Sequence, residues 1–352
     1  MACLDFSHGG NVYDAKRALG RDILDFSANI NPLGLPRYAK KLVAENMDAV
    51  MHYPDPGSRD LVRAIARHWK IAGENILVGN GSIEFIYLIA HALKPETAQV
   101  AAPDFSEYER ALRAVGARVS FLGLDEKDGF GLHARRAKRA DILFFSNPNN
   151  PTGSIVVGDS SVVERLPAKT VVVDEAFMDF VPGEENRTMV RCAARSKKIV
   201  VFRTFTKFFA LAGLRIGVLV AHTDTIRMLK RHQAPWSANA LAQIIAERML
   251  RDGKYAERTQ AFVERERAHL RGALDAIDGL RPFPSVTNYI LVKIGRKGVT
   301  SGLIARRLLE KGIAIRDCGN FRNLRGQFMR LAVRSKDEND RLIEGLTWAL
   351  KR

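Results

Sequence analysis

The sequence predicts an α/β fold in which a large domain with a mostly parallel central sheet is joined to a smaller α+β domain. Short apolar segments alternate with amphipathic segments through the middle of the chain, as in parallel sheets covered by helices on both faces. Glycine, asparagine or aspartate follows several of the apolar segments. After Trp236 the alternation gives way to longer helical segments and fewer strands. A chain of 352 residues is long enough for two such domains.

The large domain is expected to contain strands identified by short apolar runs and helices with one apolar face. The expected strands are residues 76–78, 99–102, 118–122, 142–145, 170–174, 198–202 and 216–221. The expected helices are residues 58–69, 83–92, 107–115 and 224–232. Ligands bind such sheets beyond the carboxyl ends of the strands, so we expect a functional site in the loops there.

The smaller domain is expected to begin at residue 236. Its expected helices are residues 239–251, 255–277 and 301–311 with a last helix from Asp337, and its expected strands are 289–293, 313–316 and 328–333. Residues 1–45 are expected to form a segment that packs with this smaller domain. The large domain then spans residues 46–235, and the small domain spans residues 236–352.

The composition predicts a globular protein of the cytoplasm. Hydrophobic residues make up 46% of the chain, and no apolar run is long enough to span a membrane. The first residues lack the basic and apolar regions of a signal peptide. Cys3, Cys192 and Cys318 are scattered and odd in number, which predicts neither a disulfide framework nor a metal site.

The net charge of +16, from 55 basic and 39 acidic residues, is unusually high. The basic residues are spread along the chain, and the densest clusters, 135–139 and 195–198, lack interleaved aromatic residues. We therefore expect no nucleic-acid binding. The charge favours a small anionic substrate, or serves solubility.

Lys207 is a candidate for covalent chemistry because of the residues around it. It follows Thr204 and Thr206, precedes Arg215 by eight positions, and has three phenylalanines within two residues of it. Apolar neighbours desolvate an amine, which lowers its pKa and makes it a better nucleophile. Such a lysine can form a Schiff base with an aldehyde cofactor, and the threonine hydroxyls with Arg215 suit a phosphate on that cofactor.

Asp174 follows the apolar residues 171–173 at the end of an expected strand. A buried carboxylate is unfavourable without a partner, and the protonated nitrogen of a pyridine ring is one such partner. The alternative is a helix N-cap. Lysine, carboxylate and phosphate cradle together are what pyridoxal 5'-phosphate (PLP) requires of a protein.

Two further loops follow expected strands. Residues 79–82 (Gly-Asn-Gly-Ser), with Glu84 in the next turn, suit phosphate binding through backbone amides. Alternatively they form an ordinary turn capped by Ser82. Residues 147–153 (Asn-Pro-Asn-Asn-Pro-Thr-Gly) form a rigid loop or one whose asparagine amide holds the ring oxygen of the cofactor.

Arg330 and Arg334 are expected on one strand, and their even spacing predicts that they point to the same face. Two guanidinium groups on one face are unfavourable unless they are solvated or face anions, so the pair suits carboxylate or phosphate. By themselves, the histidine-containing segments 8–11 and 52–56 indicate ordinary turns.

The motifs Asn-Pro-Thr-Gly, Asp-Glu-Ala and Thr-x-Thr-Lys-x7-Arg, in this order, resemble those of the fold-type I PLP enzymes of the class I/II aminotransferase superfamily. The resemblance covers nearly the whole chain and implies the fold-type I PLP-dependent transferase fold. It implies that Lys207 is the Schiff-base lysine and that Asp174 pairs with the pyridine nitrogen. The implied cofactor-binding residues are Tyr53, Gly81, Ser82, Phe105, Asn150, Asp174, Phe177, Thr204, Thr206, Lys207 and Arg215.

Three of these residues have particular roles in the resemblance. Phe105 is the residue that stacks on the PLP ring, and Asn150 contacts the ring oxygen. Tyr53 reaches the phosphate of the cofactor in the neighbouring subunit, which implies a homodimer with shared active sites.

Within that superfamily, five segments resemble the threonine-phosphate decarboxylases of cobalamin biosynthesis. These segments are residues 8–11, 25–34, 174–180, 233–240 and 330–335. The substrate of those enzymes is L-threonine O-3-phosphate, and we expect Arg330, helped by Asn29, Arg334 and His8, to bind its anionic groups. The related aminotransferases usually carry tyrosine at the position of Phe177 and lack an arginine at that of Arg334.

Two alternatives stay open from the sequence. One is a histidinol-phosphate or related aminotransferase, and the other is a decarboxylase that prefers L-serine O-phosphate, since one methyl group changes affinity only about 10–200-fold. The chain departs from the decarboxylases at Ser82-Ile83, where Glu-Thr is usual, and at Ala212, where proline is common. Arg322 and Arg325 add positive charge after residues 317–321. The identity of the phosphorylated substrate therefore stays open from the sequence.

Overall fold

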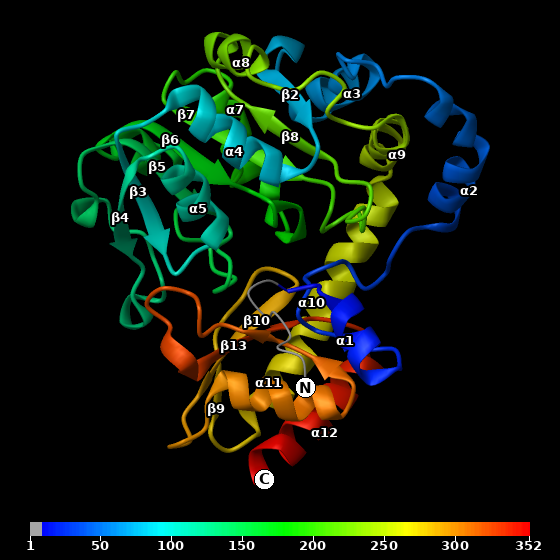
Figure 1. Cartoon of the computed structure of the whole chain (residues 1–352), viewed down its shortest axis with the longest axis vertical. Coiled ribbons are helices and arrows are strands. Elements are labelled where there is room, and N and C mark those ends of the chain that lie inside the picture. The colour runs from blue at the N-terminus through cyan, green and yellow to red at the C-terminus, as the bar shows by residue number, and fades with distance from the viewer. Residues whose placement is uncertain (1–8) are drawn as a thin grey trace.

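The computed structural model describes residues 9–352, and its largest unit is a seven-stranded sheet of order β2-β8-β7-β6-β5-β3-β4 (Figure 1). The strands are β2 (Ile76–Gly79), β3 (Thr97–Ala102), β4 (Arg118–Gly123), β5 (Ala140–Ser146), β6 (Ala168–Asp174), β7 (Ile199–Thr204) and β8 (Gly217–Val220). Only β8 runs against its neighbours, β2 and β7. This mostly parallel sheet confirms the predicted α/β fold.

Helices cover both faces of the sheet because its strands are apolar on both sides. Along β6, Val171 and Val173 face one core and Val172 faces the other, as the two-residue repeat of a strand requires. One core is closed by α4 (Ser82–Leu93), α5 (Ser106–Ala114) and α8 (Thr223–Lys230). The other is closed by α3 (Arg59–Trp69), α9 (Ala240–Leu250) and the first part of α10 (Gly253–Asp275).

A second unit, at the other end of the molecule, is built on a four-stranded antiparallel sheet of order β12-β13-β10-β9 (Figure 1). Its strands are β9 (Leu280–Pro282), β10 (Tyr289–Ile294), β12 (Arg316–Asp317) and β13 (Phe328–Ala332). Its core also takes side chains from the second half of α10, from α11 (Ser301–Glu310) and from α12 (Lys336–Lys351). The long helix α10 therefore connects the two units.

The N-terminal part of the described chain contacts both units. β1 (Leu24–Asp25) pairs in parallel with β11 (Ile313–Ala314), and Phe26 is buried in the core of the second unit. α1 (Val12–Leu19) lies at that end of the molecule, whereas α2 (Arg37–Glu45) lies beside α9 (Figure 1). The division into residues 1–45, 46–235 and 236–352 stays a prediction; α9, which follows its second boundary, packs against α3.

Two expected strands differ from the observed ones. Residues 313–316 form two short strands, because the chain passes from the partner of β1 to the four-stranded sheet at the buried Ile315. The last strand ends at Ala332, so the prediction that Arg334 lies on it is wrong. The helices α1, α2, α6 (Ser160–Arg165) and α7 (Val190–Ala193) were not predicted from the sequence. Of these, α6 and α7 are too short for helical periodicity to be recognised.

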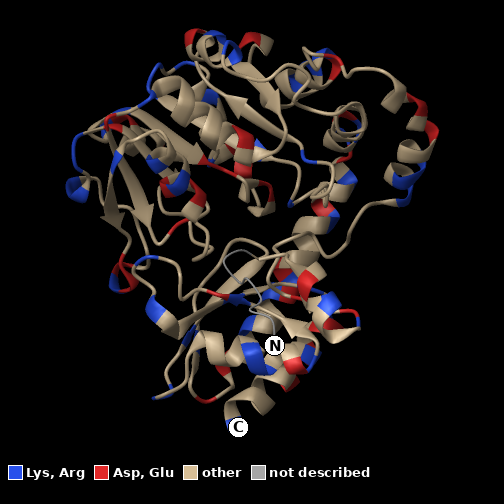
Figure 2. Cartoon of the chain, in the orientation of Figure 1, with Lys and Arg blue, Asp and Glu red and all other residues tan. Residues whose placement is uncertain are grey.

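Charged residues are distributed over the whole molecule. Figure 2 shows basic residues on helices and loops of both units, interspersed with acidic ones. Within residues 9–352, no helix is both long and apolar enough to cross a membrane. In the same residues, no cluster of three or more His, Cys, Asp or Glu is placed to hold a metal ion.

Candidate active site

Polar residues at several strand ends meet at one edge of the large sheet. Ser146, at the end of β5, lies beside Asp174 at the end of β6. Thr204, at the end of β7, lies beside Gly217 at the start of β8, and Gly79 at the end of β2 lies on the other side of Gly217. The loops that leave these strands therefore surround one site.

Lys207 follows β7 by three residues and is half-buried at this edge. The three phenylalanines that flank it are all buried. Burial lowers the pKa of the Lys207 amine to about 8, and the positive charges of Arg330 and Arg215 act in the same direction. The amine therefore becomes neutral, and nucleophilic, at a lower pH than that of an ordinary lysine.

Asp174 is buried at the end of β6 and holds two hydrogen bonds. Its Oδ2 accepts from the hydroxyl of Tyr108 at 2.5 Å, and its Oδ1 accepts from the backbone N–H of Ala176 at 2.8 Å. Burial raises the pKa of Asp174 to about 6, although both hydrogen bonds and the charge of Lys207 favour the ionised form. No helix begins at Asp174, so the alternative that it is a helix N-cap is wrong.

Tyr108, which sequence reasoning missed, connects Asp174 to α5. Its ring is fully buried, stacks on Phe144 with ring centroids 5.3 Å apart, and meets Phe105 edge to face at 5.7 Å. Burial raises the pKa of Tyr108 well above its usual value, so its hydroxyl stays protonated and donates to Asp174. The available signal was a second aromatic residue three positions after Phe105, in the first turn of the helix that follows it.

The residues expected to hold the cofactor phosphate converge at the start of α4. A Cβ atom on Gly81, whose φ is +79°, would lie 2.6 Å from Nη2 of Arg215. A Cβ atom on Gly217 would lie 2.9 Å from the backbone nitrogen of Ser82. The two glycines therefore let this loop, the amino end of α4 and the guanidinium of Arg215 approach one another, as an anion site requires.

Two threonines and a serine complete this cradle. The hydroxyls of Thr204 and Thr206 lie 2.9 Å apart, and Thr204 is paired with Gly217 in the sheet. Gly81 is the N-cap residue of α4, which receives no side-chain cap. The alternative that Ser82 caps an ordinary turn is therefore wrong, and its backbone N–H lies in the first turn of the helix.

The asparagine-rich loop is held rigidly by its own side chains, and the contact of an asparagine amide with the cofactor stays a prediction. Asn147 holds the loop, since its Oδ1 accepts from Val156 N at 2.9 Å and its Nδ2 donates to Val157 O at 3.0 Å. Asn149 is also buried and bonded within the loop. Asn150 differs, because its Oδ1 accepts from Nη1 of Arg330. The rigid part of the loop thus places Asn150 between the sheet edge and Arg330.

A second buried carboxylate, Asp104, was also missed. It accepts hydrogen bonds from the backbone N–H of Ser146 and of Phe105, both at 2.8 Å, and from the hydroxyl of Ser146. Burial raises its pKa to about 8. Asp104 therefore fixes the ends of β3 and β5 and the position of Phe105. Asp104 could have been predicted from the same sequence pattern as Asp174, which is an acidic residue just after an apolar strand.

Phe177 lies in the turn after Asp174, where its ring meets Tyr289 edge to face with centroids 4.9 Å apart. The hydroxyl of Tyr289 donates to the backbone carbonyl of Asn149 at 2.8 Å. Tyr289, at the start of β10, thus connects the second unit to the asparagine loop and to Phe177.

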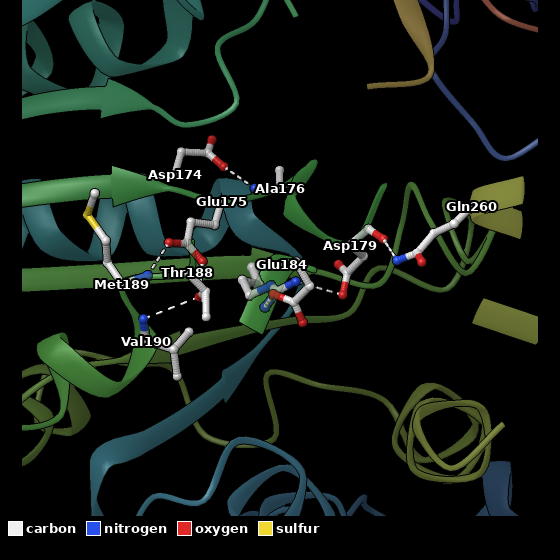
Figure 3. Close-up of polar contacts among 10 residues, drawn as sticks. Asp174, Glu175, Ala176, Asp179, Glu184, Thr188, Met189, Val190 and Gln260 are labelled. Carbon is white, nitrogen blue, oxygen red and sulfur yellow. Dashed lines mark hydrogen bonds and ion pairs between the residues drawn. The ribbon is translucent and has the colours of Figure 1, made fainter. Parts of the chain in front are cut away.

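A buried ionic network holds the turn that carries Asp174 and Phe177 (Figure 3). Glu175 accepts from Met189 N at 2.6 Å and from the hydroxyl of Thr188. Arg203, on β7, donates to Asp179 and Glu184, in each case at 2.8 Å. Burial raises the pKa of Glu175 to about 7 against the charge of Arg203. This network fixes the backbone on one side of the site.

Arg330 of β13 is buried and reaches the site from the second unit. Its Nη2 donates to Ser27 O at 2.7 Å, and its Nη1 donates to Asn150. With its amide oxygen turned toward Arg330, Asn29 lies 3.3 Å from Nε and 3.2 Å from Nη1. The structure therefore brings Asn29, Asn150, Lys207 and Arg330 together, as the sequence predicted.

Arg316 was not among the predicted site residues. It lies on β12, directly opposite Arg330 in the antiparallel register, and both side chains are buried. Burial lowers the pKa of Arg330 to about 10, with a further contribution from the charge of Arg316. Like charges opposite each other on paired strands repel, and an anion close to both relieves that repulsion.

Arg334 has different neighbours. Its Nη1 donates to Asp25 O at 3.1 Å, and its Nη2 pairs with Glu338 at 2.7 Å. Arg330 and Arg334 thus both contact carbonyls of residues 25–27, but a carboxylate already neutralises Arg334. His8, the remaining predicted substrate residue, lies outside the described residues.

Tyr53 lies at the surface of the single chain, with 81% of it exposed. Its ring stacks on Trp236 with centroids 4.6 Å apart and an interplanar angle of 25°. The expected contact with a neighbouring subunit stays a prediction.

Comparisons with known proteins show which sequences this chain resembles. A family model described as aminotransferase class I and II matches residues 21–346. The threonine-phosphate decarboxylase of Salmonella typhimurium is 36% identical to this chain, and the match covers 98% of this chain and 97% of that protein.

Two solved structures have similar folds. The L-threonine-O-3-phosphate decarboxylase of Porphyromonas gingivalis has a TM-score of 0.82 at 27% identity, covering 93% of this chain and 99% of the other. The histidinol-phosphate aminotransferase of Clostridium acetobutylicum has a TM-score of 0.85 at 28% identity, and the match covers 93% of this chain and 98% of the other. Fold similarity is thus shared with two kinds of enzyme, so the residues of the site carry the distinction.

Proposed function

The chain belongs to the aminotransferase class I and II family of PLP enzymes, and from this premise we propose that it decarboxylates L-threonine O-3-phosphate. The products are (R)-1-amino-2-propanol O-2-phosphate and carbon dioxide, and the reaction serves cobalamin biosynthesis. The observation that carries the proposal is the 36% identity with a decarboxylase of that substrate over nearly the full length of both chains.

The described residues fit PLP. Lys207 supplies an amine of lowered pKa, and Asp174 supplies a buried carboxylate for the pyridine nitrogen. The cradle formed by Gly81, Ser82, Thr204, Thr206 and Arg215 would hold the phosphate; Asn150, Phe105 and Phe177 would surround the ring. When bound, PLP supplies an aldehyde that condenses with amines and a ring that accepts the electrons of the bond that breaks.

The arginines bind and orient the anionic groups of the substrate. Arg330 and Arg316 are buried side by side on paired strands, which suits a substrate with both a carboxylate and a phosphate. Their placement of the substrate selects the bond that breaks. A carboxylate held tightly by a salt bridge resists loss as neutral carbon dioxide, so we assign the stronger grip of these guanidinium groups to the phosphate.

Lys207 also moves a proton. With a pKa of about 8, its Nζ accepts and returns protons near neutral pH. We assign to it the return of a proton to the α-carbon after the carboxylate has left.

We further propose a homodimer with shared active sites in the cytoplasm. Among the described residues, the exposed large apolar side chains include Met47, Val50, Met51, Tyr53 and Trp236. Such clustered exposure is typical of a surface that another chain covers. Cys192 and Cys318 are unpaired, as expected in a reducing compartment.

The proposal is tested by supplying the purified protein and PLP with L-threonine O-3-phosphate and, separately, with L-serine O-phosphate. We expect carbon dioxide and an amino-alcohol phosphate from the threonine compound, with a kcat/KM about 10-fold or more above that for serine phosphate. A preference for serine phosphate would replace the proposed substrate by the alternative one.

The second candidate is histidinol-phosphate transamination, which the TM-score of 0.85 with such an enzyme supports. Its product would be a keto compound, and the cofactor would be left in its amine form. Formation of these products from histidinol phosphate, without release of carbon dioxide from either amino-acid phosphate, would contradict decarboxylation.

Replacing Tyr108 with phenylalanine is expected to move the acid limb of the kcat/KM profile to higher pH. The Tyr108 hydrogen bond lowers the pKa of Asp174, which burial has raised to about 6. Without that bond the pKa rises, so Asp174 is protonated, and loses its charge, at a higher pH than in the parent protein. We expect kcat/KM at pH 7 to fall about tenfold.

The matched control is Tyr87→Phe. Tyr87 also donates to a carboxylate, Glu107, at 2.9 Å, but this bond joins α4 to α5 and does not involve Asp174. This variant should keep the parent pH profile, and an equal displacement in both variants would contradict a specific role for Tyr108.

A further inference from the structure

Residues 233–239, which we call the bridge segment, run between the phosphate cradle and Tyr53. At the centre of the bridge segment, Trp236 stacks on Tyr53 with ring centroids 4.6 Å apart. Trp236 is 47% exposed and has a φ of +56°. A bulky residue seldom adopts this left-handed conformation, which persists only where the surrounding contacts impose it. The segment therefore holds the indole in a defined place at the surface.

Three anchors tie the bridge segment to the phosphate cradle. Gln233 Nε2 donates to Glu84 Oε1 at 3.0 Å, and the hydroxyl of Ser237 donates to Glu84 Oε2. Asn239 Nδ2 donates to Leu214 O at 2.8 Å, one residue before Arg215. Glu84 itself lies in the first turn of α4 and accepts from the backbone N–H of Asn80. The indole is thus fixed relative to the site of its own chain.

The backbone around Tyr53 is fixed in a similar way. The carboxylate of Asp55 accepts from Gly57 N at 3.0 Å and from Arg59 N at 2.8 Å. Gln243 of α9 donates to the backbone carbonyl of Asp55 at 3.1 Å. Only the direction of the Tyr53 ring then needs to be set, and among the described residues the stacked Trp236 sets it.

We propose that Trp236 is a positioning residue that holds Tyr53 toward the cofactor phosphate of a second copy of this chain. The proposal rests on the homodimer of the proposed function and adds to it the residue that aims Tyr53. Stacking limits the rotation of the phenol, so its hydroxyl meets the partner's phosphate at a lower entropic cost. Loss of Trp236 should therefore weaken cofactor binding in the opposite subunit.

The test uses hybrid dimers of two differently tagged chains, in which one chain carries Lys207→Ala. Only the site of the other chain can then retain borohydride-fixed PLP. In the first hybrid, Trp236→Ala is placed on the chain that carries Lys207→Ala. In the second, Trp236→Ala is placed on the chain with Lys207 intact. The dissociation constant of PLP at the intact lysine is measured by titration before reduction.

We expect the first hybrid to bind PLP about tenfold more weakly than a hybrid without Trp236→Ala, the effect of losing one hydrogen bond to a charged group. The second hybrid should match that parent. Equal weakening in both, weakening in the second alone, or no weakening would each overturn the proposal. A monomeric protein in sedimentation would overturn it as well.

Three variants on the first hybrid's Lys207→Ala chain keep the result interpretable. Tyr53→Phe in place of Trp236→Ala should reproduce the weakening, because it removes the hydroxyl. Trp236→Phe should restore most of the binding, because it keeps a stacked ring. Tyr13→Ala removes another exposed aromatic residue, 70% exposed on α1, and should have no effect. The experiment measures PLP binding without any substrate. Its result therefore does not depend on whether the protein decarboxylates L-threonine O-3-phosphate.

Discussion

Replacing Lys207 with alanine is expected to abolish turnover, with a loss on the order of 10⁴-fold or more, as when a group that acts at the reacting atoms is removed. The visible absorbance of covalently bound PLP should disappear with it. The physical reason is that the half-buried amine, with a pKa lowered to about 8, is the nucleophile in the proposed function. Absorbance spectra and release of carbon dioxide from the purified variant check both effects.

Two control variants distinguish the loss of the reactive Lys207 amine from the loss of its positive charge. Lys207→Arg keeps a positive charge but stays protonated, so it should be as inactive as the alanine variant. Lys169→Ala removes a lysine that is largely exposed and paired with Asp141, and it should behave as the parent. Turnover retained by Lys207→Ala would remove Lys207 from the mechanism.

The rate at which Lys207 of the cofactor-free protein reacts with added PLP is expected to depend on pH. Only the neutral amine reacts with an aldehyde, and its fraction grows as the pH rises through the pKa of about 8. The rate of capture should therefore rise with pH and level off above about 8, well below the pKa of an ordinary lysine.

Replacing Arg330 with methionine is expected to lower kcat/KM for the amino-acid phosphate about 100-fold or more, mainly through a higher KM. Removing one partner of a buried, hydrogen-bonded charge pair costs about 2–5 kcal/mol. Methionine keeps much of the length of the side chain but cannot bond to Ser27, Asn150 or a substrate anion. Steady-state kinetics measure the effect, and an unchanged PLP absorbance would show that the cofactor site is intact.

The matched control is Arg334→Met, four residues farther along the chain. Glu338 already neutralises Arg334 at 2.7 Å, so we expect KM to change less than about tenfold, the range of an ion pair that is not fully buried. An equal or larger rise in KM for Arg334→Met would move the phosphate contact to Arg334 and contradict the assignment of Arg330.

Residues within contiguous motifs could be predicted well from the sequence. The alternation of apolar strands and helices identified the sheet, because burial on both faces requires continuously apolar strands. Lys207, Asp174 and Asn150 could be proposed as site residues because the chemistry of each is indicated by its immediate neighbours. The structure places all three at one edge of the sheet, where parallel strands end.

Residues that depend on pairing between distant segments could not be found in this way. Arg316 faces Arg330 only because β12 pairs with β13 in one register, and the expected strand 313–316 concealed the break at Ile315. Tyr108 reaches Asp174 across 66 positions of sequence. Even spacing suggested that Arg334 and Arg330 are equivalent, yet the strand ends at Ala332 and Glu338 makes them different.

The sequence by itself indicated the family and the cofactor and singled out Lys207 as the candidate lysine, since short motifs encode the local chemistry that PLP needs. The tertiary structure alone decided which arginines face each other, what holds Asp174, and which ring supports Tyr53. The physical reason is that hydrogen bonds, charge repulsion and stacking act over a few ångströms. Only folding brings the residues of different elements within that range.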